Sequence, residues 1–206
     1  MIRSLRNTVF FLTHFIFTIP FRLIFQIESN GRSVELSKTK SYIIAANHPS
    51  KLDPFIILAG LPLKTFLKLS PFAFLTAEDY LKKWHYKPFL LMWSCVSNKE
   101  KDKLKPLQKL KKQLENKETV FIFPRGELEK RGNPSLPKVG VVYLEKDVKD
   151  SYILPVKVEF TNKLTFLNVI KRKVKTKITF KKEFRHRKFK KDLQPLANDV
   201  IEKILR

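Results

Sequence analysis

His48 and Asp53 form a candidate acid–base pair in the stretch NHPSKLD at residues 47–53. On one continuous helix, this spacing would place the two side chains about 140° apart, on different faces. A turn at Pro49, followed by a helix that begins at Asp53-Pro54, would bring them together. A carboxylate that holds an imidazole fixes its tautomer and stabilises its charged form, which is the chemistry of a general base. The spacing alone is common, so a hydrogen-bonded structural histidine is the alternative.

A second candidate motif begins about 70 residues later, where the apolar run TVFIF at 119–123 leads directly into Pro124-Arg125-Gly126-Glu127. The run predicts a strand, and Phe-Pro-x-Gly at its end predicts a tight turn. Open α/β sheets bind ligands at such strand ends. The turn is therefore expected to lie where a sheet of this kind places its substrate.

The elements that must position these motifs alternate between strands and helices. This pattern predicts a single α/β domain with a mostly parallel or mixed central sheet flanked by helices. We expect strands at 41–46, 72–77, 93–97, 119–123, 152–158, 164–170 and 174–180. We expect helices at 55–59, with Asp53 as cap, at 78–93, 103–116 and 139–148, and from Leu196 onward. Pro155 favours an edge position or a bend for its strand.

The N-terminal residues 9–27 are apolar and rich in Phe, and the stretch is about as long as a bilayer crossing. His14, Pro20 and Arg22 interrupt it, and no small-residue cleavage site follows, which disfavours a signal peptide. An interfacial helix, a spanning helix and a buried core helix are the alternatives. We expect a membrane-associated helical segment over residues 1–30 and the α/β domain over 31–206.

The chain is strongly basic, with 42 Lys or Arg against 19 Asp or Glu and a formal charge of +23. Such a surface attracts anionic lipid head groups, nucleic acid, or an acidic carrier protein or coenzyme. Residues 163–191 hold thirteen of the basic residues and a single acid, Glu183. Anionic lipid is the leading interpretation of this segment, ahead of a solvated face or a docking site for an acyl carrier. No nucleic-acid-binding motif is present, so nucleic acid is not expected.

Other kinds of site have little support in the sequence. Five glycines argue against a Gly-rich nucleotide-binding protein, and no Cys/His cluster suggests a metal. The one cysteine, Cys95, is expected to be a buried thiol. Ser50 lies close to His48 but no nucleophile elbow surrounds it, which disfavours a serine hydrolase.

The order Asn-His-x4-Asp followed by Phe-Pro-x-Gly resembles the glycerophosphate and lysophospholipid acyltransferases, of the 1-acylglycerol-3-phosphate acyltransferase type. Order and spacing agree over about residues 40–160, with weaker echoes in Lys138-Val139-Gly140 and Ile153–Val156. The resemblance implies that His48, held by Asp53, deprotonates a lysolipid hydroxyl that attacks the thioester of acyl-CoA or an acyl carrier protein. Backbone N–H groups near the turn would steady the oxyanion. No cofactor or metal is implied, and the enzyme would work at the cytoplasmic face of the (inner) membrane.

The chain departs from the family pattern on the acceptor side. The family's block Phe-Pro-Glu-Gly-Thr-Arg corresponds to residues 123–128, where Arg125, Glu127 and Leu128 replace its Glu, Thr and Arg. An earlier block of the family ends in a second arginine, and Asn98 stands at or near that position. A phosphate-binding arginine is not freely replaced by Asn or Leu. The acceptor is therefore expected to be either glycerol-phosphate-like or a lysolipid without that phosphate, and a non-catalytic lipid-binding or transfer protein is the alternative. The expected substrate-binding residues are Asn47, Asn98, Lys99, Phe123, Pro124, Arg125, Gly126, Glu127 and Lys138.

Overall fold

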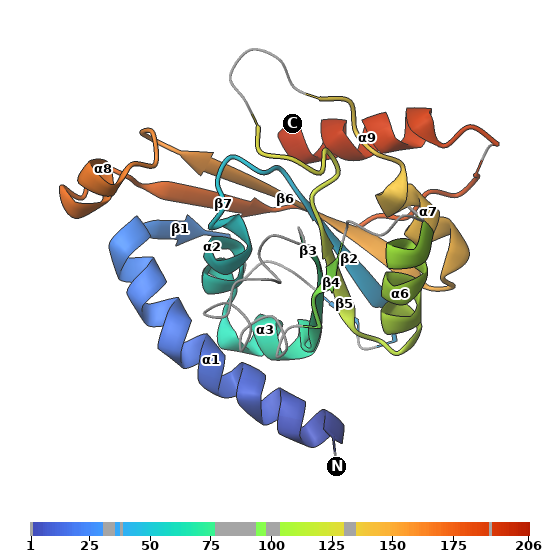
Figure 1. Cartoon of the computed structure of the whole chain (residues 1–206), viewed down its shortest axis with the longest axis horizontal. Helices are drawn as coiled ribbons and strands as arrows, with labels where there is room; N and C mark the ends of the chain where they lie inside the picture. Colours follow the sequence, from blue (N-terminus) through green and yellow to red (C-terminus); the bar gives the residue numbers. More distant parts are fainter. Residues whose placement is uncertain are drawn as a thin grey trace.

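The computed structural model describes residues 2–30, 36–37, 39–76, 94–97, 104–129, 135–189 and 191–206. Within these residues, seven strands form one sheet in the order β1-β7-β6-β2-β5-β3-β4 (Figure 1). The strands are β1 Ile27–Ser29, β2 Ser41–Ala46, β3 Phe72–Thr76, β4 Val96–Ser97, β5 Thr119–Ile122, β6 Ser151–Phe160 and β7 Thr176–Phe180. The helices are α1 Ile2–Phe25, α2 Asp53–Gly60, α3 Leu63–Leu69, α6 Leu104–Glu115, α7 Gly140–Asp147, α8 Phe166–Ile170 and α9 Gln194–Leu205.

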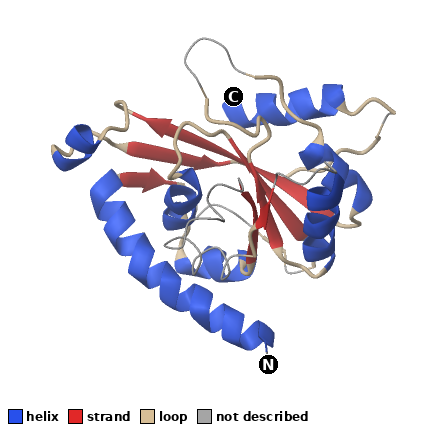
Figure 2. Cartoon of the chain, in the orientation of Figure 1, coloured by secondary structure: helices blue, strands red, loops and turns tan. Residues whose placement is uncertain are grey.

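The sheet separates two layers of helices, with α1, α2 and α3 on one side and α6, α7 and α9 on the other (Figures 1 and 2). Side chains alternate along a strand, so neighbouring residues of central β2 enter different cores. Ile44 packs in the core under α2 and α3, whereas Ile43 packs in the core under α6 and α7. All six residues of β2 are buried, which explains why this strand contains no charged residue.

The prediction of an α/β domain with a mixed sheet is confirmed. Only β6 and β7 run antiparallel among the paired strands of the described residues, and the other pairs are parallel. The observed strands β2 to β6 and helices α2, α6, α7 and α9 match the predicted ranges to within a few residues. The expected helix at 78–93 lies outside the described residues.

One prediction around β6 and β7 is wrong, and one of the two alternatives for Pro155 is excluded. Residues 164–170 do not form a strand, because Thr165 caps the short helix α8 by accepting a hydrogen bond from the Asn168 N–H. Pro155 does not lie on an edge strand, since β6 is placed between β2 and β7. The chain tolerates this proline because the regular ladder between β6 and β7 ends at Val156 and Phe180, next to it.

Helix α1 packs one face onto α2 and continues through Pro20. His14 and Thr18 are buried in this face, and the Arg22 guanidinium donates to the Ala59 carbonyl at 2.7 Å. Burial, together with the Arg22 charge, lowers the pKa of His14 to about 4, so this histidine is a neutral core residue. None of the helices in the described part of the chain has the length and apolarity that a membrane crossing needs.

Candidate active site

His48 and Asp53 meet at the end of the central strand, as the predicted turn requires. β2 ends at Ala46, and the turn at 49–52 brings the chain back so that His48 Nδ1 lies 2.9 Å from Asp53 Oδ2. Asp53 is the first residue of α2 and not its cap, which is Leu52. The carboxylate instead accepts the Ser50 N–H at 2.8 Å, which fixes the turn around the histidine.

The Asp53 carboxyl group is fully buried, and this sets its electrostatics. Burial raises its pKa, although the hydrogen bonds from His48 and the Ser50 N–H oppose the shift. Its other oxygen, Oδ1, has no hydrogen-bond partner among the described residues. A buried carboxylate with few partners interacts strongly with any positive charge on the adjacent ring. Asp53 is therefore suited to stabilise a His48 imidazolium.

The His48 ring is held on a second side by Phe123. The two rings stack with centroids 3.8 Å apart and planes 12° from parallel. With Nδ1 bonded to Asp53, Nε2 is the ring nitrogen that can accept a proton, and no hydrogen bond to Nε2 is found among the described residues. The His48 side chain keeps 18% of its surface exposed, so a substrate hydroxyl can reach it.

The predicted Phe-Pro-x-Gly turn is present directly after β5. The Gly126 N–H donates to the Phe123 carbonyl at 2.8 Å, and Gly126 has a φ of +72°, a conformation that favours glycine. The Lys138 N–H donates to the Pro124 carbonyl at 2.7 Å, and the Lys138 side chain lies over Gly126. The structure thus brings together residues of two separate predicted motifs.

Glu129 was not predicted as a site residue, yet it joins the two motifs. Its N–H donates to the His48 carbonyl at 2.8 Å, while its carboxylate accepts from Arg125 Nη1 at 2.7 Å and from Asn47 Nδ2 at 3.4 Å. The signal in the sequence was the opposite charges at positions 125 and 129, a spacing of four residues. Arg125 is consequently engaged by a carboxylate inside the protein.

Asn47 is a structural residue in this geometry. Its side-chain amide donates to the Val158 carbonyl at 2.9 Å and accepts the Val158 N–H at 2.7 Å, so it joins the end of β2 to β6. Glu127 is exposed on the turn. Asn98 and Lys99 lie outside the described residues, and their expected contacts with substrate stay predictions.

The remaining candidate nucleophiles are poorly suited to covalent chemistry. Burial raises the pKa of Cys95 to about 11, so this thiol is not ionised at neutral pH. The Ser50 hydroxyl is buried and accepts the Leu52 N–H at 2.9 Å.

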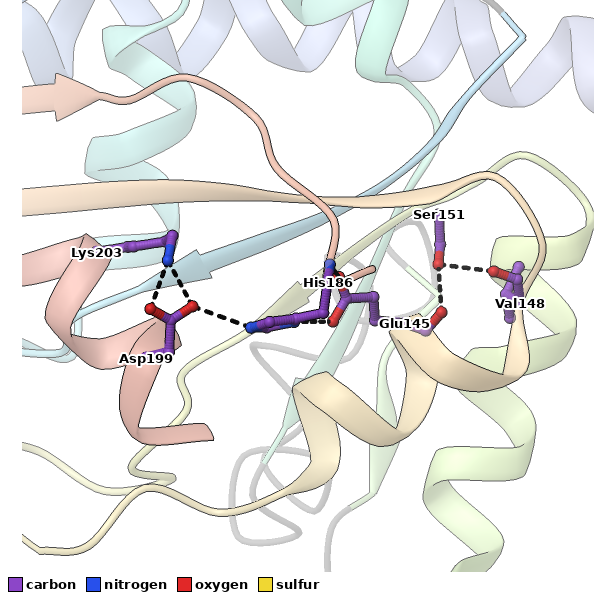
Figure 3. Close-up of polar contacts among 6 residues, drawn as sticks. All are labelled: Glu145, Val148, Ser151, His186, Asp199 and Lys203. Atoms are coloured by element: carbon purple, nitrogen blue, oxygen red, sulfur yellow. Dashed lines mark hydrogen bonds and ion pairs between the residues drawn. The ribbon is translucent and has the colours of Figure 1, made fainter. Parts of the chain in front are cut away.

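A second histidine centre, which the sequence did not predict, joins α7, α9 and the segment after β7 (Figure 3). His186 Nδ1 lies 2.6 Å from the fully buried Glu145 carboxylate, and Nε2 lies 3.0 Å from Asp199. Lys203 contacts both Asp199 oxygens at 2.5 Å. Burial lowers the pKa of His186, but the two carboxylates outweigh it, and the net shift is upward. Both ring nitrogens are occupied, so His186 is a structural residue.

The basic segment at 181–189 is anchored by this centre. Phe184 and Phe189, which alternate with its cations, pack against the core under α7 and α9. His186 also donates its backbone N–H to Glu145 at 2.6 Å. The aromatic residues of this segment therefore contribute to the core.

Comparison with known proteins gives the family. A family model described as Acyltransferase matches residues 27–159, which include the His48–Asp53 pair and the turn at 123–126. The crystal structure of the 1-acyl-sn-glycerophosphate (LPA) acyltransferase, PlsC, from Thermotoga maritima superimposes with a TM-score of 0.63 at 15% identity, covering 98% of this chain and 94% of that one. No curated protein sequence matches significantly. The matched region spans more than half of the chain, and the chain therefore belongs to the Acyltransferase family of enzymes.

Proposed function

We propose that this enzyme transfers a fatty acyl chain from a thioester donor, acyl-CoA or acyl carrier protein, to a lysolipid hydroxyl at the cytoplasmic face of a membrane. The observation that carries this proposal is the contact of 2.9 Å between His48 Nδ1 and the buried Asp53 carboxylate. It leaves Nε2 as the basic atom next to solvent. The similar fold of a lysophosphatidate acyltransferase supports the same class of acceptor.

In the proposed reaction, His48 Nε2 removes the proton of the acceptor hydroxyl while its oxygen attacks the thioester carbonyl. A tetrahedral intermediate forms and collapses, the C–S bond breaks, and the proton passes from His48 to the departing thiolate. Asp53 stabilises the imidazolium that exists between these two transfers. The products are an acylated lipid and a free thiol, with no covalent enzyme intermediate.

One expected source of oxyanion stabilisation needs correction. The Gly126 N–H is already bonded to the Phe123 carbonyl inside the turn. It is therefore a poor donor to a developing oxyanion, since it would have to break this hydrogen bond first. That other backbone N–H groups near the turn supply this stabilisation stays a prediction.

Whether the site can bind a phosphate of the acceptor depends on which of its cations are free of ion pairs. Arg125 is bound to Glu129, so its charge is largely neutralised within the protein. Lys138 lies over the turn and forms no ion pair within the described residues. This ammonium group can bind one phosphate of a glycerol-phosphate-like acceptor. We therefore favour a phosphate-bearing lysolipid over a neutral one.

The membrane association in this proposal rests on α1. Opposite its buried face, the helix exposes large apolar residues at spacings of three and four, which place them on one face. These residues are Phe11, Leu12, Phe15, Ile16, Ile19 and Leu23, and each is 38% to 63% exposed. A helix with such a face is suited to lie in the lipid interface.

A thiol-release assay tests the proposal. Purified protein is incubated with labelled acyl-CoA or acyl carrier protein and a panel of lysolipids, and the acylated product is measured. We expect His48→Ala to lower the rate about 10³-fold without changing the circular dichroism spectrum. Acceptor-dependent turnover that survives in His48→Ala would contradict the mechanism. Lipid exchange between vesicles without any thioester consumption would point to the non-catalytic alternative.

Lys138→Ala tests the acceptor, with Lys146→Ala, an exposed lysine on α7, as the matched control. We expect Lys138→Ala to raise the KM for lysophosphatidate about tenfold, because one charge-assisted contact is lost. The KM for a lysolipid without phosphate should not change. Equal effects on both acceptors, or equal effects of the two variants, would contradict a phosphate site at Lys138.

A further inference from the structure

The loop that joins β6 to β7, residues 161–175 and hereafter the α8 loop, exposes large apolar side chains. Helix α8 has no buried residue. Phe166 is 79% exposed, Leu167 is 65% exposed and Ile170 is 61% exposed. Spacings of three and four residues from Ile170 place all three on one face of the helix. Exposing three adjacent large apolar side chains to water is unfavourable, which indicates a binding partner for this face.

The α8 loop is held in place by its own hydrogen bonds. The Asn168 side chain donates to the Lys163 carbonyl at 2.8 Å, and Asn162 donates to the Lys173 carbonyl at 2.6 Å. On the inner side, Leu164 and Val169 pack against the core of the domain. The apolar face therefore points outward because the remainder of the loop is fixed.

Cations surround this apolar face. Lys163, Lys171, Arg172, Lys173 and Lys175 are all exposed, and no acidic residue occurs between positions 161 and 175. None of the five forms an ion pair with another described residue. Apolar side chains at the centre with lysines and arginines around them match the layers of an anionic bilayer, whose acyl chains lie beneath its charged head groups.

The α8 loop lies at the C-terminal end of α1 (Figure 1). Gln26, just after α1, donates to the Arg172 carbonyl at 2.7 Å and links the two elements. The exposed residues Leu23 and Ile24 of α1 are therefore close to the loop in space. Two separate apolar elements at one end of the molecule can fix the orientation of the protein on a surface. A single helix would leave the protein free to rotate about the helix axis.

We propose that the α8 loop inserts Phe166, Leu167 and Ile170 into the interface of an anionic lipid bilayer, while its cations bind the head groups. This inference deepens the membrane association proposed above and does not depend on the identity of the acyl acceptor.

Vesicle sedimentation tests the apolar part. Wild-type protein is compared with Phe166→Ser/Leu167→Ser and with the control Leu104→Ser/Leu205→Ser, which replaces two exposed leucines on α6 and α9. On phosphatidylcholine vesicles that contain phosphatidylglycerol, we expect the α8 loop variant to bind about tenfold more weakly or worse, and the control to bind as wild type. Wild-type affinity in the α8 loop variant would overturn the proposal.

The cationic part is tested with Lys171→Gln/Lys173→Gln against Lys112→Gln/Lys146→Gln, a pair of exposed lysines on α6 and α7. We expect only the first pair to lower affinity for the anionic vesicles, by about tenfold, because only these lysines would lie near the head groups. Equal losses in both pairs would attribute binding to the overall charge and overturn the placement of the α8 loop.

Acyl transfer to lysolipid in detergent micelles separates this inference from the proposed enzyme activity. The α8 loop variants should keep the wild-type micellar rate, whereas His48→Ala should lose that rate and still bind vesicles. Wild-type protein that consumes thioester in micelles but does not bind anionic vesicles would overturn the α8 loop proposal and leave the enzyme mechanism standing.

Discussion

The described residues contain two histidine–carboxylate centres that differ in how many partners the ring has. His48 bonds one fully buried carboxylate, Asp53, through Nδ1 at 2.9 Å. His186 bonds a fully buried carboxylate, Glu145, and a second one, Asp199, so both of its ring nitrogens are occupied. Asp53 and Glu145 are equally buried, whereas Asp199 is partly exposed. A single carboxylate leaves a nitrogen for proton transfer, whereas two carboxylates convert the histidine into a cross-link between helices.

Replacing Asp53 should have the strongest effect on the reaction. We expect Asp53→Asn to lower kcat about 10³-fold, because a neutral amide neither stabilises the imidazolium nor fixes the same tautomer. The free energy of unfolding should stay the same or rise, since burial already raises the pKa of this carboxyl and disfavours its charge. Steady-state kinetics and urea unfolding measure the two quantities. Asp147→Asn, a half-buried carboxylate at the end of α7, is the control, and near-wild-type kcat in Asp53→Asn would refute the role of Asp53.

His186 should show the opposite behaviour. We expect His186→Ala to lower the free energy of unfolding by about 3 kcal/mol, because it removes the ring that faces the buried Glu145 charge. The kcat of the folded protein should change less than about twofold, since no step of the proposed reaction uses this ring.

The double variant Glu145→Gln/His186→Ala is the control for this effect, because it removes the unpaired charge as well. Much of the lost stability should return in urea unfolding. If the double variant were as unstable as the sum of both single variants, the two residues would not be coupled as the structure indicates.

Phe123 offers a smaller change within the first centre. We expect Phe123→Leu to lower kcat by about tenfold, since it removes the ring stacked 3.8 Å from His48 while keeping an apolar side chain. Phe184→Leu, which removes the aromatic contact beside His186, is the matched control and should leave kcat unchanged. Equal kcat values for the two variants would show that the stack on His48 has no catalytic effect.

The smallest expected effect is a pH dependence of stability. Because the folded-state pKa of His186 is raised, its contribution is fully present below the unfolded-state value of about 6.5 and is lost as the pH rises through the folded-state value. The groups that face the ring are Glu145 from α7 and Asp199 from α9, with Lys203 behind Asp199.

Urea unfolding of wild type and His186→Ala at pH 6 and pH 9 measures this contribution. We expect the difference between the two proteins to shrink at the higher pH. A difference that grows with pH would contradict a raised folded-state pKa of His186.

The two centres also differ in how far the sequence predicts them. His48 and Asp53 lie five residues apart, and the proline and helix start between strand and carboxylate indicate the turn that joins them. Glu145 is 41 residues from His186, and Asp199 is 13 residues further on, so no local pattern marks this centre. The tertiary packing of α7, α9 and the segment after β7 brings its members together.

The difference between local sequence patterns and contacts made in the folded chain also explains the errors in the predicted secondary structure. Buried strands such as β2 are apolar on both faces and are recognised from their composition. Residues 164–170 have a similar composition, but a hydrogen bond to the Thr165 side chain starts a helix whose apolar residues face outward. Strand β1 has three residues, which is too short for a periodic pattern, and it forms by pairing with the distant β7. Phe184 and Phe189 alternate with the cations of the basic segment, yet both rings pack against the core.

The role of His48 as the base is tested by the rate of acceptor-dependent thiol release in His48→Ala and His186→Ala, each corrected for its folded fraction. We expect His48→Ala to lose about 10³-fold in rate per folded molecule, whereas His186→Ala keeps its rate per folded molecule and loses stability. A His186→Ala enzyme that is fully folded and inactive, or a His48→Ala enzyme that retains its rate, would contradict the assignment of proton transfer to the His48–Asp53 pair.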